Sequence, residues 1–317
     1  MLRKKEIQDF LQEFEDKFIP TKIDPSKIEI LGYGEISTVM SFKEEELKHL
    51  AFKRLPIFTD EKEACDYAQI HIEYNKLLGK LNIEVPESEV YCVKGHGDRI
   101  VNYFSQQRQH ENSIGNKIIH IHSKEESLIL FNLLLDKMKK LWYHNLNNPD
   151  LQLGLDSQIS NWAVKNYHED IKITEDTELL FIDTSTPFIR KKGEEQMNPL
   201  LFLESAPKPM RPVLRKFFLQ DIMDRYYDFR LVAIDLLANL FKEQRVDMIE
   251  DCRQIVNDKA GDLLDDKEIS YKEIEKYYKE DKFIWQLYLG ARRFDRFVKV
   301  KILNKRYEYT LPGKIRR

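Results

Sequence analysis

Two aspartates and an asparagine in the middle of the chain have residue types and spacing that suit a metal ion. Asp156 and Asn161 stand five residues apart in a polar loop, and Asp183 ends a strand-like apolar run over 179–182. Magnesium in proteins is bound by one or two carboxylates together with substrate phosphates. The competing interpretation is structural, because an aspartate at the end of a strand is commonly a turn residue.

Two glycines near the N-terminus suit the close approach of a phosphate. Gly32 and Gly34 lie between two strand-like segments within 27–42. Glycine lets the backbone turn tightly and present N–H groups to an anion. A strand on each side argues against a Rossmann or Walker site, where a helix begins directly after the glycines. An ordinary hairpin turn remains the alternative.

A lysine in a predicted strand is followed, twenty residues later, by a glutamate in a predicted helix. Lys53 interrupts a short apolar strand over 50–56, and Glu73 lies in a predicted helix over 60–79, capped by Thr59. In kinase-type sites a strand lysine binds the α- and β-phosphates and a helix glutamate orients it. Glu63 is the second candidate for that partner. A strand lysine is otherwise an exposed surface residue.

The remaining elements indicate an α+β fold with two parts. The apolar spacing over 4–18 predicts an amphipathic helix that packs on its own domain. Two strands are expected over 84–93 and 99–104, followed by a helix over 124–143 with a Ser123/Glu126 capping box. The segment 213–256 reads as helical. The alternation over 297–311 predicts a terminal β-hairpin.

Composition excludes several classes of protein. Hydrophobic residues make up 42% and charged residues 33% of the 317 residues, which is typical of a globular chain. The three scattered cysteines predict neither a zinc site nor a disulfide framework. No apolar run is long enough to span a membrane, so we expect a cytoplasmic protein.

The net charge is −3, yet residues 291–317 carry ten Lys or Arg against two Asp or Glu. That end suits a nucleic-acid or anionic-surface contact, although such a run is more often a solvated face.

The order of these features resembles the protein-kinase-like superfamily, nearest to its aminoglycoside phosphotransferase and choline kinase branches. The resemblance covers roughly residues 27–240. It implies a two-lobed fold, with a β-rich N-lobe over 1–104 and a mainly helical C-lobe over 105–317. It also implies ATP and Mg²⁺ as cofactors.

The resemblance implies a role for each residue of the pattern. Gly32 and Gly34 would cover the phosphates, and Lys53 would bind them with Glu73 in support. Asp156 would be the catalytic base. Asn161 and Asp183 would hold Mg²⁺, and the adenine would lie against the backbone of 103–106, with Tyr103 and Ser105 in contact.

The chain departs from the superfamily pattern in four places. Ser37 replaces the third glycine, and Gly154 replaces a histidine that supports the catalytic loop. Asp183 is followed by Thr-Ser-Thr-Pro, and 27 residues separate it from Asp156, which an extended hairpin over 166–178 would absorb.

Three functions follow from this pattern. The first is an ATP-dependent phosphotransferase acting on a small hydroxylated or amino substrate. The second is a pseudokinase or nucleotide-binding scaffold, which the departures at Ser37 and Gly154 favour. The third is transfer of AMP onto a protein.

Overall fold

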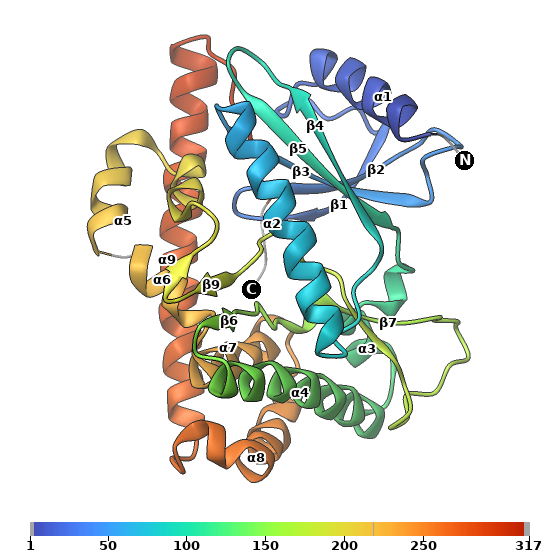
Figure 1. Ribbon diagram of the computed structural model, residues 1–317, viewed down its shortest axis with the longest axis vertical. Helices are drawn as coiled ribbons and strands as arrows, with labels where there is room; N and C mark the ends of the chain where they lie inside the picture. Colours follow the sequence, from blue (N-terminus) through green and yellow to red (C-terminus); the bar gives the residue numbers. More distant parts are fainter. Residues whose placement is uncertain (1–2, 218, 314–317) are drawn as a thin grey trace.

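A five-stranded antiparallel sheet forms the N-terminal part of the chain in this computed structural model, which describes residues 3–217 and 219–313 (Figure 1). The strands follow the spatial order β1-β2-β3-β5-β4. Their bounds are β1 (Ile28–Tyr33), β2 (Thr38–Phe42), β3 (Leu50–Phe58), β4 (Ser88–Lys94) and β5 (Ile100–Gln107). The central strand β3 carries Lys53 and pairs with both β2 and β5.

Helix α1 (Lys4–Lys17) packs on one face of this sheet. Its apolar stripe places Ile7 and Leu11 in a core shared with Phe42 and Phe52 of strands β2 and β3. The prediction of an amphipathic helix that packs on its own lobe is confirmed.

Helix α2 (Glu61–Lys80) connects β3 to β4 and lies on the opposite face of the sheet. Ala64 and Tyr67 pack with Phe58 and Phe104 there. The helix is capped by the side chain of Asp60, which accepts a hydrogen bond from the Glu63 backbone N–H, and not by Thr59. Toward its C-terminal end α2 reaches the helical lobe, where Leu78 joins the large core (Figure 1).

The second lobe is mainly helical and is built around α4 and α7. Both contribute long rows of buried side chains to its core. The predicted capping box of Ser123 and Glu126 begins α4. The helices are α3 (Gly115–Ile121), α4 (Lys124–Asn147), α5 (Arg211–Phe217), α6 (Leu219–Arg225), α7 (Phe229–Lys242), α8 (Ile249–Ala260) and α9 (Tyr271–Phe297).

Short strands line the side of this lobe that faces the sheet. They are β6 (Leu151–Leu153), β7 (Trp162–Val164), β8 (Leu179–Phe181), β9 (Ile189–Lys191) and β10 (Glu194–Glu195). β7 pairs with β8, and β6 pairs with β9. A sheet lobe interrupted by one helix, followed by a helical lobe with several short strands, is the two-lobed kinase-like fold predicted from the sequence.

The C-terminal β-hairpin predicted over 297–311 is wrong. Helix α9 continues to Phe297, a π-helical turn follows over Val298–Ile302, and the described residues beyond it form no strand. Short alternating runs are ambiguous between strand and helix, and here packing decides. Tyr307, Tyr309 and Leu311 lie in the core formed by α2 and the sheet, so this end of the chain packs on the first lobe.

Two further points concern the whole chain. No helix within residues 3–217 and 219–313 has the length and apolar character needed to cross a membrane. The division into lobes at residue 104 remains a prediction, because the C-terminal segment contributes to the core of the first lobe.

Candidate functional site

A cavity of about 510 Å³ lies between the two lobes and contains most of the residues chosen from the sequence. Its walls include Gly32, Gly34, Lys53 and Ser105 from the sheet lobe, with Asn161 and Asp183 from the other side. A second hollow of about 290 Å³ shares Lys53, Asn161 and Asp183 with it and adds Asp156. The two hollows therefore adjoin at the charged residues.

The hairpin of β7 and β8 brings Asn161 and Asp183 together. Trp162 pairs with Phe181, so the residues just outside the pairing lie side by side, and the Ile182 N–H donates to the Asn161 carbonyl at 2.9 Å. The loop between these strands absorbs the long separation along the chain, as predicted. Lys53 Nζ then meets Asp183 Oδ1 at 2.6 Å across the cleft.

Asp156 and Asn161 are held by one loop. The Asn161 amide nitrogen donates to the Asp156 carbonyl at 3.0 Å, which leaves the amide oxygen of Asn161 available to a ligand. One carboxylate oxygen of Asp156 is buried without a hydrogen-bond partner. Burial raises the pKa of Asp156 to about 7, and the charges of Asp235 and Asp183 add to the effect. A carboxyl group with such a pKa is suited to accept a proton near neutral pH.

Gly154, at the position where the resemblance expects a histidine, is closely packed. A Cβ at this position would lie 2.9 Å from both the Phe188 Cβ and the Tyr226 carbonyl oxygen, so only glycine fits. Its N–H donates to the Phe188 carbonyl at 3.0 Å, and its carbonyl accepts from the Tyr74 hydroxyl at 2.8 Å. The loop that carries Asp156 is fixed by backbone contact and by helix α2.

The predicted pairing of Lys53 with Glu73 is wrong. Glu73 forms an ion pair with Lys191 of β9 at 2.8 Å, and the second candidate, Glu63, accepts from the Asn198 amide. Helix α2 presents His71 to the site instead, with its Nε2 3.0 Å from Thr184 Oγ1. His71 lies in the wall of the larger cavity.

The surroundings keep His71 neutral. Burial lowers its pKa to about 4, and the positive charge of Lys53 acts in the same direction. His71 thus stands near Lys53 without competing for Asp183 as a cation. Sequence reasoning missed this residue, although it lies on the buried face of α2 that also carries Tyr67 and Tyr74.

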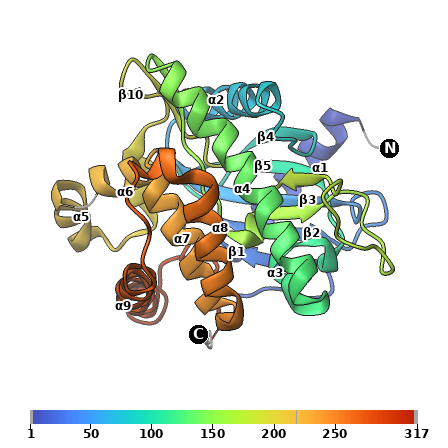
Figure 2. The ribbon, with the colours of Figure 1, turned by 90° about the horizontal axis from the view of Figure 1, so that it is seen from below.

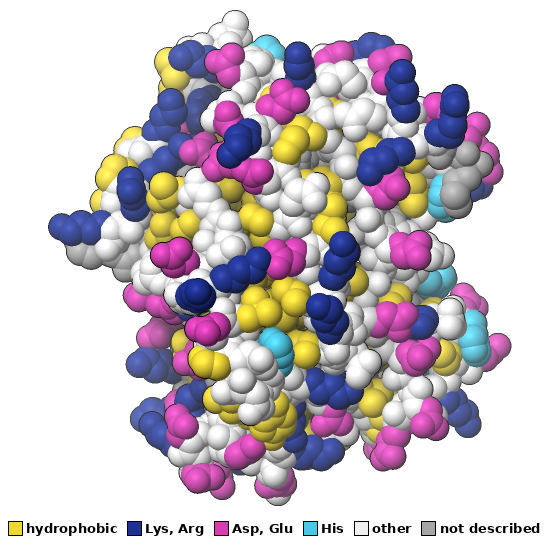
Figure 3. Space-filling model, viewed as in Figure 1, with side chains coloured by type: hydrophobic (Ala, Val, Ile, Leu, Met, Phe, Trp, Pro, Cys, Tyr) yellow, Lys and Arg dark blue, Asp and Glu magenta, His cyan; other side chains and the backbone are white. Residues whose placement is uncertain are grey.

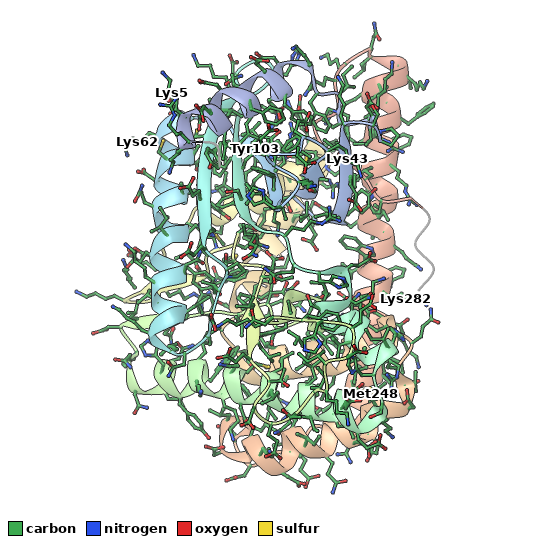
Figure 4. The ribbon with its side chains drawn as sticks, turned by 90° about the vertical axis from the view of Figure 1, so that its right-hand side faces the viewer. Lys5, Lys43, Lys62, Tyr103, Met248 and Lys282 are labelled. Atoms are coloured by element: carbon green, nitrogen blue, oxygen red, sulfur yellow. The ribbon has the colours of Figure 1, made fainter. Side chains whose placement is uncertain are left out.

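Tyr103 is not part of the cleft. Its side chain is fully buried under α1, where its hydroxyl donates to Glu15 at 2.5 Å (Figure 4). The neighbouring Phe104, Ser105 and Gln106 line the cavity. Across the sheet Lys53 pairs with Phe104 and Arg54 pairs with Tyr103. Directly opposite residues share a face, so Phe104, and not Tyr103, lies on the Lys53 face.

The glycine turn is held in place from the far end of the chain. The Gly34 N–H donates to the Ser37 carbonyl at 3.1 Å, and a Cβ on Gly34 would lie 2.4 Å from Ser37 Oγ. The guanidinium of Arg292, on α9, donates to the Glu35 carbonyl at 2.6 Å. This contact from α9 has no counterpart in the sequence prediction.

The second hollow is lined by aromatic and charged side chains that the sequence did not identify. Two acids there, Asp235 and Asp281, lie 3.5 Å from Arg225 and 3.3 Å from Lys242 respectively. The aromatic lining consists of Tyr33, Tyr74, Phe181, Phe188, Phe202, Tyr226 and Trp285. Such a lining suits an organic molecule with polar groups, next to Asp156.

The residues at the cleft fit a magnesium ion held in part by a nucleotide. Within the described residues no group of three or more histidines, cysteines and acids forms a complete metal site. Asp183 would supply one carboxylate and Asn161 one amide oxygen. Mg²⁺ bound with substrate phosphates needs no more protein ligands than these.

Several cations of the basic C-terminal run are bound within the chain. Arg292 is buried, Lys299 pairs with Asp295 at 2.7 Å, and Arg306 pairs with Glu308 at 2.9 Å. On the face drawn in Figure 3, cationic and anionic side chains are interspersed. Contact of residues 291–317 with nucleic acid or an anionic surface remains a prediction.

Comparison with known proteins gives one family and a distant structural likeness. The model of a family of unknown function, DUF6206, matches residues 20–296. No curated protein matches the sequence. Among solved structures, an amicoumacin kinase, hAmiN, in complex with AMP-PNP, Ca²⁺ and Ami, is similar at 12% identity and a TM-score of 0.32. That match covers 81% of this chain and 97% of the other. A TM-score this low adds nothing to the assignment of the fold, which rests on the topology.

Proposed function

The chain belongs to the DUF6206 family, and we propose that it is an ATP- and Mg²⁺-dependent phosphotransferase of the kinase-like fold that acts on a small-molecule acceptor. The observation that carries this proposal is the convergence of four side chains at the junction of two hollows. Lys53, Asn161 and Asp183 border both hollows, and Asp156 borders the smaller one. One hollow then takes the nucleotide and the other the acceptor.

In this proposal each residue acts on a different part of the reacting groups. Lys53 binds the α- and β-phosphates once they separate it from Asp183. Asn161 and Asp183 would hold Mg²⁺, which would supply positive charge opposite the transferred group. The glycine turn lies over the phosphates, and the segment 104–106 borders the adenine.

Asp156 orients the acceptor and takes its proton. The acceptor oxygen forms a bond to the γ-phosphorus while the bond from that phosphorus to the β–γ bridging oxygen breaks, and ADP leaves with the electron pair. The hydroxyl proton passes to the free carboxylate oxygen of Asp156. Its raised pKa of about 7 makes this transfer favourable near neutral pH.

The acceptor hollow favours a small organic molecule over a protein segment. Its aromatic walls offer flat apolar contact, and cationic groups of a ligand are attracted to such ring faces. Acids outnumber cations in its lining: the acids are Glu35, Asp156, Asp183, Asp235 and Asp281, and the cations are Lys53, Arg225 and Lys242. We therefore propose an acceptor that carries a hydroxyl group together with an apolar or amine-bearing part.

Nucleotide binding without turnover is the second candidate. Lys53 has its ion pair with Asp183 rather than with a helix glutamate, and this contact favours a resting arrangement. The departure at Gly154 no longer supports this candidate, because close packing explains it. No described contact favours AMP transfer onto a protein.

Thermal unfolding with ADP, with and without Mg²⁺, tests the proposal. A ligand at 100 times its Kd adds about 2.7 kcal/mol to the stability, and we expect a Mg²⁺-dependent rise in Tm that Asp183→Asn abolishes. Glu73→Gln is the matched control and should keep the rise, since Glu73 binds Lys191. An unchanged Tm in every nucleotide condition would contradict the proposal.

Product analysis separates the candidates. Incubation of the protein with ATP, Mg²⁺ and a panel of hydroxylated amines should release ADP and add a phosphoryl mass to one acceptor. A Mg²⁺-dependent Tm shift without ADP release would support the binding-only candidate. An acceptor mass increased by AMP would support AMP transfer.

A further inference from the structure

Helix α9 presents a row of large apolar side chains to solvent. Phe283, Leu287, Phe294 and Phe297 recur at helical spacing and are 66%, 59%, 68% and 53% exposed. Ile284 extends the row and is 60% exposed. Four exposed aromatic or leucine side chains in one row exceed the scattered apolar residues of an ordinary surface, and such a row marks an interaction site.

The opposite face of α9 is already used by the chain. Trp285 and Asp281 line the acceptor hollow, and Arg292 holds the glycine turn. Leu289 is buried against the body. The helix runs along one edge of the molecule (Figure 1) and, seen from below, lies at the periphery with α7 packed against one side of it (Figure 2). Its outer row therefore faces away from both lobes.

Gly290 lies in the middle of the row, and no contact among residues 3–217 and 219–313 requires a glycine there. Nothing lies within 4 Å of the position of its Cβ, and its backbone is helical. Glycine inside a helix weakens that helix relative to alanine. A glycine at the centre of an exposed row lets a second helix approach closely at that point.

The order of side-chain types along the row is similar on the two sides of Gly290. From the N-terminal end it consists of Glu280, Phe283, Leu287, Gly290, Phe294 and Phe297 of α9, followed by Lys301 in the π-helical turn that continues the helix. About Gly290, phenylalanine faces phenylalanine and leucine faces phenylalanine. At the two ends an exposed glutamate faces an exposed lysine of opposite charge. A surface that is complementary to itself under a two-fold rotation is what an isologous homodimer requires.

We propose that the occupant of this row is α9 of a second copy of the chain. The two helices cross antiparallel at Gly290, with Phe283 of one copy near Phe297 of the other and Glu280 near Lys301. The antiparallel arrangement also brings opposite ends of the helix dipoles together.

The size of the contact predicts a dimer of modest affinity. Six phenylalanines and the leucines beside them offer apolar area on the order of 1,000 Å². This lies just below the lower bound for stable specific interfaces, about 1,200 Å², where weak and transient interfaces fall. We expect dissociation in the micromolar range, so that the dimer forms in a concentration-dependent way. Since α9 also carries Trp285 and Arg292, pairing would fix the helix that borders the acceptor hollow.

Sedimentation equilibrium of the full chain tests this proposal over a range of concentrations into the high micromolar. Glu280→Lys and Lys301→Glu should each raise the dissociation constant about tenfold or more, because each places like charges together. The double variant Glu280→Lys/Lys301→Glu should restore the wild-type value. Both positions are exposed, so the variants should fold as the wild type does.

A second pair of variants separates pairing from helix stability. Gly290→Ala should raise the thermal stability of the dilute monomer and weaken the dimer, whereas Gly290→Leu should abolish the dimer. A wild type that stays monomeric at every concentration would overturn the proposal. So would a charge-swapped pair that fails to restore pairing, or a monomer that sediments with anionic phospholipid vesicles through Phe294 and Phe297.

Discussion

Lys53 on β3 and Asp183 after β8 meet directly, Nζ to Oδ1 at 2.6 Å, although they are 130 residues apart in the chain. Both side chains are partly buried in the cleft, at 16% and 32% exposed. In the proposed function the lysine binds phosphate and the aspartate binds metal, so a nucleotide with its ion enters between them. The pair holds both groups in the cleft before any ligand arrives.

The first prediction concerns this pair and its supposed helix partner. Lys53→Ala should lower the affinity for ADP with Mg²⁺ about 10- to 100-fold, because it removes a charge-assisted contact worth about 1.5–3 kcal/mol. Glu73→Gln should leave the affinity unchanged, because Glu73 binds Lys191. Titration calorimetry measures both. Equal losses in the two variants would show that Glu73 does support Lys53 when nucleotide is bound.

The second prediction concerns the pH dependence of transfer. The carboxylate form of Asp156 is the active one, and its pKa is about 7. The value of kcat/KM for the acceptor should therefore fall as the pH drops through 7. Asp235→Asn should move this acid limb to lower pH, because it removes a negative charge that raises the pKa of Asp156 and frees Arg225, which lowers it.

Asp98→Asn, at an exposed turn between β4 and β5, is the matched control and should leave the profile in place. The profiles are measured by ADP release at saturating ATP. An acid limb at the same pH in Asp235→Asn and the wild type would show that Asp156 is not the group that titrates.

The third prediction concerns Gly154. Gly154→Ala should destabilise the fold by about 1–3 kcal/mol, because the new Cβ meets Phe188 and the Tyr226 backbone at 2.9 Å. Gly79→Ala, in α2 with nothing within 4 Å, should instead stabilise it by about 0.5–1 kcal/mol. Urea unfolding compares the two. If the two variants changed the free energy of unfolding by the same amount and in the same direction, close packing would be ruled out as the reason for Gly154.

The sequence was sufficient to predict those cleft residues whose positions depend only on the pairing of strands close together in the chain. Asp183 follows a strand that pairs with the strand after Asn161, and this pairing alone brings the two together. Gly32 lies near the end of β1 and Gly34 in the turn to β2, so this hairpin likewise joins two strands that are consecutive in the chain. Such relations span few elements, so that residue type and order in the chain suffice to find them.

Helix orientation was harder to predict, as Glu73 shows. The buried positions of α2 include Tyr67, His71, Tyr74 and Leu78, spaced four, three and four residues apart. Glu73 follows His71 by two residues, about 200° around the helix, and so points away. This stripe is visible in the sequence and would have favoured His71 over Glu73. Strand alternation would likewise have separated Tyr103 from Phe104.

The acceptor hollow and the role of α9 were beyond prediction. Arg225 and Asp235, on the consecutive helices α6 and α7, meet Trp285 of the more distant α9 around Asp156. Their arrangement depends on how the helices of the second lobe pack, which no local pattern specifies. The same holds for Arg292, whose contact with Glu35 joins the two ends of the chain.

The fourth prediction concerns His71 and the stability of the fold in acid. Its pKa lies at about 4 in the folded chain, below the ordinary value of 6.5, because burial disfavours the charged ring. Between these values the unfolded chain binds a proton that the folded chain does not. Stability is therefore lost as the pH falls from 6.5 to 4 and not further below, by a total on the order of 3 kcal/mol.

His71→Gln keeps a partner for Thr184 and should remove most of this loss. His49→Gln, at an exposed position, is the matched control and should behave as the wild type. Urea unfolding at several pH values gives the three curves, and a curve for His71→Gln parallel to that of the wild type would show that His71 is not buried in its neutral form.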